Sequence, residues 1–289
     1  MLFRSKDGLV LNRRNSESFD EEQIEEYLQT PDDNILYHVV AALRKGISIE
    51  KIYHLSAIDP WFLKKINNII EVERRLKSSV LDQKLLSTAK KFGFSDKQIG
   101  RAVNKEELEV RKIRKDFGII PAVKQIDTLA AEWPAETNYL YLTYGGTEND
   151  ISIASVDSGI IVLGAGPYRI GSSVEFDWGT VNMVWGLQDG GQKNVIVVNC
   201  NPETVSTDYD ICNRLYFEEL TLERILDISE FEKPKGIVTS VGGQTANNLT
   251  PKLADSGITL IGTNAVDVDR AENRSKFSQV LDRLHIRQP

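Results

Sequence analysis

A glycine-rich turn follows an apolar stretch in "VLGAGPYRIGSSVEFDW". Such a turn after a buried strand holds the phosphates of a dinucleotide when its glycines are spaced G-x-G-x-x-G, and an acid about twenty residues later binds the ribose. Gly164 and Gly166 fill the first two positions, but Arg169 stands at the third, and the next glycine is Gly171. After the second apolar stretch, "NVIVVNCN", the first acid is Glu203. Because both requirements fail, a nicotinamide- or flavin-dependent dehydrogenase is only a minor alternative.

Charged side chains gather around this turn. Arg169 lies before its last glycine, Glu175 and Asp177 lie after it, and a second acidic loop, "NCNPETVSTDYD", follows the next strand. The first two strands of a parallel sheet are commonly neighbours, so we expect the two loops to share one rim. Facing carboxylates repel a bare phosphate and suit a polar, water-filled passage. An ion-pair network of these three side chains that only fixes the loop is the structural alternative.

The composition excludes several classes of protein. A chain of 289 residues, 41% hydrophobic and 27% charged, fits two ordinary globular domains. Cys200, Cys212 and three scattered histidines offer no closely spaced ligand set, so we expect no metal site and a reducing compartment. The sequence contains neither an apolar run long enough to span a membrane nor a signal-peptide pattern. We therefore expect a cytoplasmic protein without a membrane partner.

The charge distribution argues against nucleic acid as a partner. The net charge is −7, and residues 1–150 balance 23 basic with 24 acidic side chains. The stretch "FSDKQIGRAVNKEELEVRKIRKDFGI" has the rhythm of a helix-turn-helix, but Glu106, Glu107 and Glu109 would face the DNA phosphates. The alternative to an enzyme is a non-enzymatic helical module that binds a partner protein or DNA and is joined to a Rossmann-like domain.

Hydrophobic periodicity divides the chain into two parts. Residues 1–150 contain short amphipathic helices, for example one with Asp59 as its cap and Pro60 at its first position. An apolar, extended connector follows from Ile119, and we expect it to pack on a domain. Residues 151–289 alternate strands with helices and end with a strand in "ITLIGT" and a closing helix in "AENRSKFSQVLDRL". This alternation predicts a parallel sheet with ligands at the carboxyl ends of its strands. The predicted fold is α + α/β, an all-helical domain followed by a Rossmann-like domain.

Several segments together resemble the large chain of carbamoyl-phosphate synthase. In the second part these are "VLGAGPYRIGSSVEFDW", "VNCNPETVSTDYD", "RLYFEELTLERILDI", "GGQTANNL" and "IGTNAVDVDRAENRSKF". In the first part, "LSAIDPWFLKKINNIIEVE" and "GFSDKQIGRAV" resemble the helical domain of the same enzyme. The resemblance implies an oligomerisation domain followed by the pre-ATP-grasp domain of the half that forms carbamoyl phosphate.

This family is an ATP-dependent ligase that makes carbamoyl phosphate from bicarbonate, glutamine-derived ammonia and two ATP, for arginine or pyrimidine synthesis. The resemblance implies ATP with Mg²⁺ or Mn²⁺ as cofactors, with the metal ligands and the catalytic residues outside this segment, which should be inactive alone. Implied partners are a glutaminase small chain or domain, the remaining ATP-grasp and allosteric domains of the large chain, and further copies in a homo-oligomer. A eukaryotic form could work in the mitochondrial matrix instead of the cytoplasm.

The resemblance also assigns roles to individual residues. Arg274 matches an arginine that contacts ATP of the second site. Glu175 and Glu203 match carboxylates that line a passage for carbamate between the two active sites, and Ser173 and Val174 match small or apolar positions along it. Carbamate decomposes quickly in water, so a shielded route raises the fraction that is delivered. The residues expected to shape the surrounding loops are Gly164, Gly166, Arg169, Gly171, Gly242 and Gly243.

Overall fold

The computed structural model describes residues 20–152, 159–168 and 173–288. The chain forms two compact units, Met1–Ile120 and Pro121–Pro289. We placed the domain boundary at residue 150, whereas the compact units meet at residue 120. The difference arises because the connector supplies two strands to the sheet of the second unit. The predicted α + α/β fold class is confirmed.

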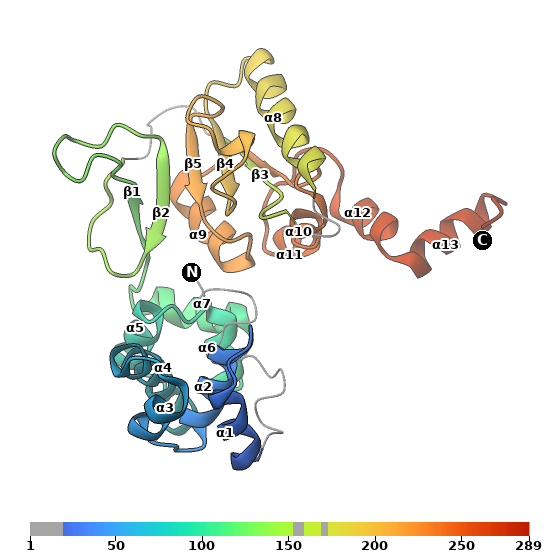
Figure 1. The fold of residues 1–289 in the computed structure, drawn as a ribbon. Helices are drawn as coiled ribbons and strands as arrows, with labels where there is room; N and C mark the ends of the chain where they lie inside the picture. The colour runs from blue at the N-terminus through green and yellow to red at the C-terminus, as the bar shows by residue number, and fades with distance from the viewer. Residues whose placement is uncertain (1–19, 153–158, 169–172, 289) are drawn as a thin grey trace. The chain divides into compact units, whose positions relative to one another are not determined.

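The described part of the first unit consists of helices with recognisable start signals (Figure 1). The Asp59 side chain accepts a hydrogen bond from the Trp61 amide at 2.8 Å, and Pro60 takes the first helical position, as the sequence predicts. The second helix ends before Gly46, whose φ of 86° an L-side chain rarely adopts. The helices are α1 (Glu21–Gln29), α2 (Ile35–Arg44), α3 (Ile49–Ser56), α4 (Pro60–Ser78), α5 (Gln83–Lys91), α6 (Asp96–Val103) and α7 (Glu107–Asp116).

A buried ion cluster lies within this unit. Asp96 is fully buried, and its carboxylate accepts from Lys90 Nζ at 2.9 Å and from Arg114 Nε at 3.0 Å. Arg114 also donates to the Ile119 carbonyl at 3.1 Å, which fixes the chain after α7. The cluster therefore ties three helices and the end of the unit together.

The same cluster removes support for a DNA-recognition helix. The sequence suggested "EVRKIRK" as the basic face of such a helix, and this stretch lies in α7. However, Arg111 is 6% exposed and Arg114 is fully buried. Phosphate contacts need accessible basic side chains, so two of the four basic side chains in this stretch are withdrawn from such contacts, while Lys112 and Lys115 are exposed.

The second unit is built on a six-stranded sheet. Its strands are β1 (Ala122–Gln125), β2 (Tyr139–Thr143), β3 (Ile160–Leu163), β4 (Val195–Asn199), β5 (Arg214–Phe217) and β6 (Gly236–Val238), in the order β1-β2-β5-β4-β3-β6. All neighbours are parallel except β1 and β2. Without the first two strands the order is that of a Rossmann half, with the third, second, first and fourth strands in sequence.

Helices cover both faces of this sheet (Figure 1). On one face α8 (Val174–Asp189) buries Val181 and Val184 against β3 and β4. On the other face α9 (Leu222–Glu232), α10 (Gly243–Asn247) and α11 (Thr250–Asp255) pack on the alternate strand residues. Strands buried on both sides read as continuous apolar runs, as in "IIVL" and "VIVV".

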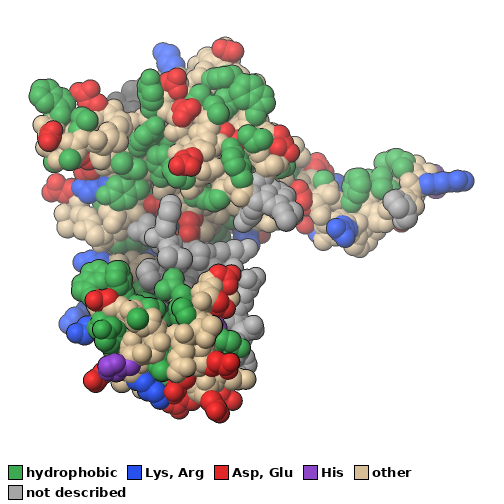
Figure 2. Space-filling view, viewed as in Figure 1, with side chains coloured by type: hydrophobic (Ala, Val, Ile, Leu, Met, Phe, Trp, Pro, Cys, Tyr) green, Lys and Arg blue, Asp and Glu red, His purple; other side chains and the backbone are tan. Residues whose placement is uncertain are grey.

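The outer face of α8 also carries apolar side chains. Trp178 and Trp185 pack edge to face with ring centroids 5.5 Å apart, yet they remain 55% and 40% exposed. Figure 2 shows hydrophobic side chains gathered over this helix. Because apolar side chains lie on both the buried and the exposed face of α8, they do not follow a clear helical period in the sequence.

The connector is an integral part of the sheet. Strand β2 pairs in parallel with β5, and Glu218, which is 4% exposed, accepts from the Leu142 amide at 2.7 Å. Arg224 lies 3.3 Å from the other oxygen of Glu218 and so holds this carboxylate in place. The expectation that the connector packs on a domain is confirmed, and its pairing partner lies more than seventy residues away in sequence.

The end of the chain differs in detail from the sequence prediction. The stretch "ITLIGT" was expected to form a strand, but only Leu260 makes a single bridge, to Ile237. The predicted closing helix is divided into α12 (Ala265–Glu272) and α13 (Arg274–Arg283), because Asn273 caps the second. These two helices extend away from the sheet (Figure 1). None of the described helices is long and apolar enough to cross a membrane.

We predict that Asp96→Ala destabilises the helical unit by about 3–5 kcal/mol, because it leaves two buried cations without their carboxylate. Glu71→Ala is the matched control, since the Glu71–Arg74 pair is about half exposed on both sides and should contribute less than about 1 kcal/mol. Urea unfolding followed by circular dichroism measures both. Equal losses in the two variants would contradict the assigned role of the cluster.

Candidate functional site

Three loops meet at one edge of the sheet. They follow β3, β4 and β6, and these strands are adjacent and parallel, so their carboxyl ends lie together. The strand order reverses between β3 and β6, which is where Rossmann-like folds bind ligands. The predicted glycine turns fall on the two loops that flank this point.

Two glycine turns touch each other there. A Cβ atom on Gly242 would lie 2.5 Å from the Leu163 carbonyl oxygen and 2.6 Å from that of Gly164. Gly166 and Gly243 have φ values of 76° and 62°, which favour glycine at both positions. At these four positions the backbone conformation or a close neighbour favours glycine. Arg169 and Gly171 lie outside the described residues.

Because of this contact, the turn differs from a dinucleotide-binding turn in its structure as well as in its sequence. In a dinucleotide fold the backbone after the first strand stays open to the pyrophosphate, which binds at the start of the next helix. Here the Gly242 backbone fills the space beside Gly164, and the first turn of α8 carries Glu175 and Asp177. The two acids complement the positive end of the helix, which is the position that a phosphate would take.

Asn199 joins the glycine turn to the end of β4. A Cβ atom on Gly164 would lie 2.7 Å from Asn199 Nδ2, so only glycine leaves room for this side chain. Asn199 Oδ1 accepts from the amides of Gly166 and Asn201, both at 3.1 Å. Asn199 is fully buried, and the sequence offered no acid at this position for a ribose. The side chain binds protein backbone instead of a ligand.

Asp177 and Ser206 continue these contacts to α8. Ser206 donates to Asp177 with its amide at 3.1 Å and also with its hydroxyl. The Ser206 hydroxyl oxygen accepts from Asn199 Nδ2 at 3.1 Å. Asp177 is 2% exposed and Ser206 is fully buried, so the contacts are shielded from water. The alternative that Asp177 pairs with Arg169 stays untested, since Arg169 is not described.

The predicted passage residues lie at the start of α8. Ser173 is the N-cap of the helix, and Val174 and Glu175 form its first two positions, both exposed. A hydrogen bond from the Ser173 side chain, assisted by the amide of Glu175 itself, lowers the pKa of the Glu175 carboxyl. The lowered pKa favours the ionised form of Glu175 at neutral pH.

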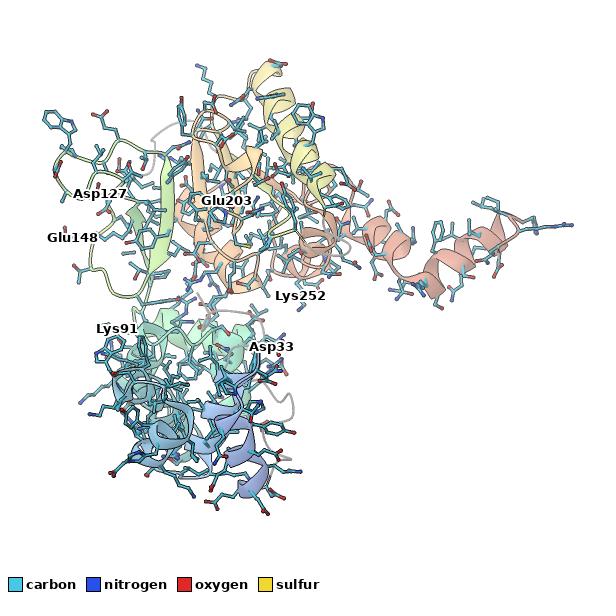
Figure 3. All side chains as sticks on the ribbon, in the orientation of Figure 1. Asp33, Lys91, Asp127, Glu148, Glu203 and Lys252 are labelled. Carbon is cyan, nitrogen blue, oxygen red and sulfur yellow. The ribbon has the colours of Figure 1, made fainter. Side chains whose placement is uncertain are left out.

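The second predicted carboxylate lies on the loop after β4. Glu203, labelled in Figure 3, is exposed, and its amide donates to Asn201 Oδ1 at 3.1 Å. The neighbouring Thr204 hydroxyl is within hydrogen-bonding distance of the Tyr168 hydroxyl on the glycine turn, at 2.5 Å. The turn that leads to α8 and Glu175 is thus in contact with the loop that carries Glu203.

Arg274 is separate from this rim. It begins α13, is exposed, and makes no hydrogen bond or ion pair with any described residue. Among the described residues, no group of three or more histidine, cysteine, aspartate or glutamate side chains could hold a metal ion. The sequence missed the roles of Asn199 and Ser206. The signal that could have found Asn199 is a polar residue that directly ends a buried strand.

The sheet order, the covering helices and the touching glycine turns define a Rossmann-like α/β domain without an open dinucleotide crevice. Two family models match the chain. That of the carbamoyl-phosphate synthetase large chain oligomerisation domain matches residues 2–118, and that of the carbamoyl phosphate synthase preATP-grasp domain matches residues 156–270.

Relatives match nearly the whole chain. It is 48% identical to the carbamoyl phosphate synthase arginine-specific large chain of Eremothecium gossypii, over 99% of this chain and 26% of that protein. It is 47% identical to the mitochondrial carbamoyl-phosphate synthase (ammonia) of Aquarana catesbeiana, over 100% of this chain and 19% of that protein. It is 50% identical to the multifunctional protein ura1 of Schizosaccharomyces pombe, over 92% of this chain and 12% of that protein.

The chain belongs to the carbamoyl-phosphate synthase large-chain family, which confirms the resemblance seen in the sequence. It spans about a quarter or less of the length of these relatives.

We predict that Gly242→Ala destabilises the sheet unit by about 3 kcal/mol, because the new methyl group overlaps two backbone oxygens. Gly186→Ala is the matched control: Gly186 lies inside α8 with open space around its Cβ position, so the change should stabilise by about 0.5–1 kcal/mol. Urea denaturation followed by tryptophan fluorescence reports both changes. If Gly242→Ala were as stable as the parent protein, the two turns would not be in contact.

Proposed function

We propose that this chain is a segment of an ATP-dependent ligase that makes carbamoyl phosphate from bicarbonate, glutamine-derived ammonia and two ATP. Its helical unit supplies the oligomerisation surface, and its sheet unit supplies part of a passage for carbamate. ATP and Mg²⁺ or Mn²⁺ act in the complete enzyme, and the segment alone has no catalytic activity. The two family models and the relatives named above support this proposal.

The observation that carries the passage is the placement of two exposed carboxyl side chains, Glu175 at the start of α8 and Glu203 on the loop after β4. Beneath them, the side chains of Asp177, Asn199 and Ser206 are buried. Exposed carboxylates at the carboxyl edge of a sheet, next to closed glycine turns, suit a hydrated route better than a nucleotide pocket. Carbamate that travels along such a route is exposed to less bulk water and so survives longer.

The partners follow from the same assignment. A glutaminase chain or domain supplies ammonia, and the ATP-grasp and allosteric domains of the large chain complete the enzyme, which forms homo-oligomers. Relatives named for arginine synthesis, for ammonia-dependent synthesis in mitochondria and as a multifunctional protein occur at similar identity, so both pathways stay open. We place the enzyme in the cytoplasm, or in the mitochondrial matrix if its source is eukaryotic.

The passage predicts that a bulky side chain at Ser173 uncouples the enzyme. In the complete large chain that carries this segment, Ser173→Phe should leave bicarbonate-dependent ATP hydrolysis intact but lower carbamoyl phosphate output about tenfold, because carbamate escapes and decomposes. The measurement is the ratio of ATP hydrolysed to carbamoyl phosphate formed.

Ser173→Ala is the control for this experiment. Like Ser173→Phe, it removes the N-cap hydroxyl that bonds Glu175, but it adds no bulk. The ratio of ATP hydrolysed to carbamoyl phosphate formed should therefore stay normal. A normal ratio in Ser173→Phe would exclude a passage at this position.

We further propose that Arg274 contacts ATP of the second site, since its guanidinium is exposed and has no partner among the described residues. In the complete enzyme, Arg274→Ala should raise the KM for ATP in carbamate phosphorylation about tenfold through the loss of a charged hydrogen bond. Arg270→Ala on the preceding helix is the control, because Arg270 already pairs with Asp267 at 3.1 Å. An unchanged KM in Arg274→Ala would refute the contact.

A further inference from the structure

The buried contacts around Asn199 form one network that runs between the two proposed passage carboxylates. Asp177 lies two residues after Glu175 on α8, and Asn201 holds the amide of Glu203. Two further members lie between these ends. Ser206 belongs to the 3-10 helix η1 (Val205–Thr207), and Asn199 is the last residue of β4. The network thus begins and ends two residues from a passage side chain.

We propose that Asp177, Asn199 and Ser206 are positioning residues that set the separation of Glu175 and Glu203, and with it the bore of the passage. The inference rests on the proposed passage function. The two glutamates are exposed and share no hydrogen bond among the described contacts, so the buried frame beneath them contributes to how far apart they lie.

The connectivity of the network distinguishes this role from ordinary core stability. Ser229 is a buried serine of the same unit, but its hydroxyl donates to the Ile225 carbonyl within a single helix, at 2.6 Å. Ser206 instead joins α8 to the end of β4, and its partner Asp177 is 29 residues away in sequence. Loss of the Ser206 hydroxyl removes the bond to Asn199 at the end of β4 and leaves only the Ser206 amide on Asp177, whereas loss of the Ser229 hydroxyl removes no bond between elements.

Asn199 extends the frame to the glycine turn. Its one amide group bonds Gly166, Asn201 and Ser206, so it fixes the turn, the acidic loop and η1 at once. Gly164 packs on the same side chain, which leaves little room for the turn to shift. A displacement of about 1 Å at such a frame is enough to change the performance of a site by a large factor.

The test compares Ser206→Ala with Ser229→Ala in the complete large chain. Each change removes one buried hydroxyl, so both should lower the unfolding midpoint. Only Ser206→Ala should raise the ratio of ATP hydrolysed to carbamoyl phosphate formed, by about threefold. In the 289-residue chain, hydrogen exchange should become faster within 160–168 and 199–207 in Ser206→Ala and stay unchanged there in Ser229→Ala.

Asn199→Asp is the second variant. It keeps the shape and the oxygen that binds Gly166 and Asn201, but it removes the donor to Ser206. We expect a raised ratio in this variant as well. A normal ratio in both Ser206→Ala and Asn199→Asp, at a temperature where both are folded, overturns the positioning role. An equal rise in Ser229→Ala also overturns it, because a general loss of stability would then explain the effect.

The result for Ser173→Phe separates the two proposals. If Ser173→Phe uncouples the enzyme and the two network variants do not, the passage stands and the positioning role fails. If Ser173→Phe stays coupled, the passage itself is wrong, whatever the network variants do.

Discussion

The approach of two backbones at Gly164 and Gly242 is the constraint on which the sheet unit depends. A methyl group at Gly242 would overlap the carbonyls of Leu163 and Gly164, so the loop after β6 can approach the end of β3 only because Gly242 lacks a side chain. Their contact lies at the reversal of strand order, where Rossmann-like folds bind ligands.

The proposed passage residues lie at the rim of this edge. Glu175 is exposed at the start of α8 and Glu203 on the loop after β4, and Asn199, Ser206 and Asp177 join these elements beneath them. Burial suits the frame, because its polar groups satisfy one another away from water. Exposure suits the carboxylates, whose charge is stabilised by solvent. The division between a buried frame and a charged rim is what a stable, hydrated route requires.

Local sequence patterns predicted those helices and strands that are determined by interactions between residues close in the chain. Asp59 with Pro60 predicted the start of α4, and the apolar runs predicted β3 and β4. The strands of the connector were not foreseen, because β2 pairs with β5, which lies far along the chain. Likewise, "ITLIGT" has the composition of a strand but makes one bridge, since strand formation depends on a partner as well as on propensity. The glycine turns were recognised, but the side chain that fills the space beside Gly164 became visible only in three dimensions.

The pairing of β2 with β5 has a consequence for synthesis on the ribosome. The helical unit can complete its core as soon as its own residues have emerged, because its contacts are internal. The hairpin of β1 and β2 is made next, but the strand that completes it, β5, is translated only after β3 and β4. During that interval β2 presents an open edge to the cell, and such edges favour pairing with other chains. The edge of β2 is therefore covered only once β5 has been made.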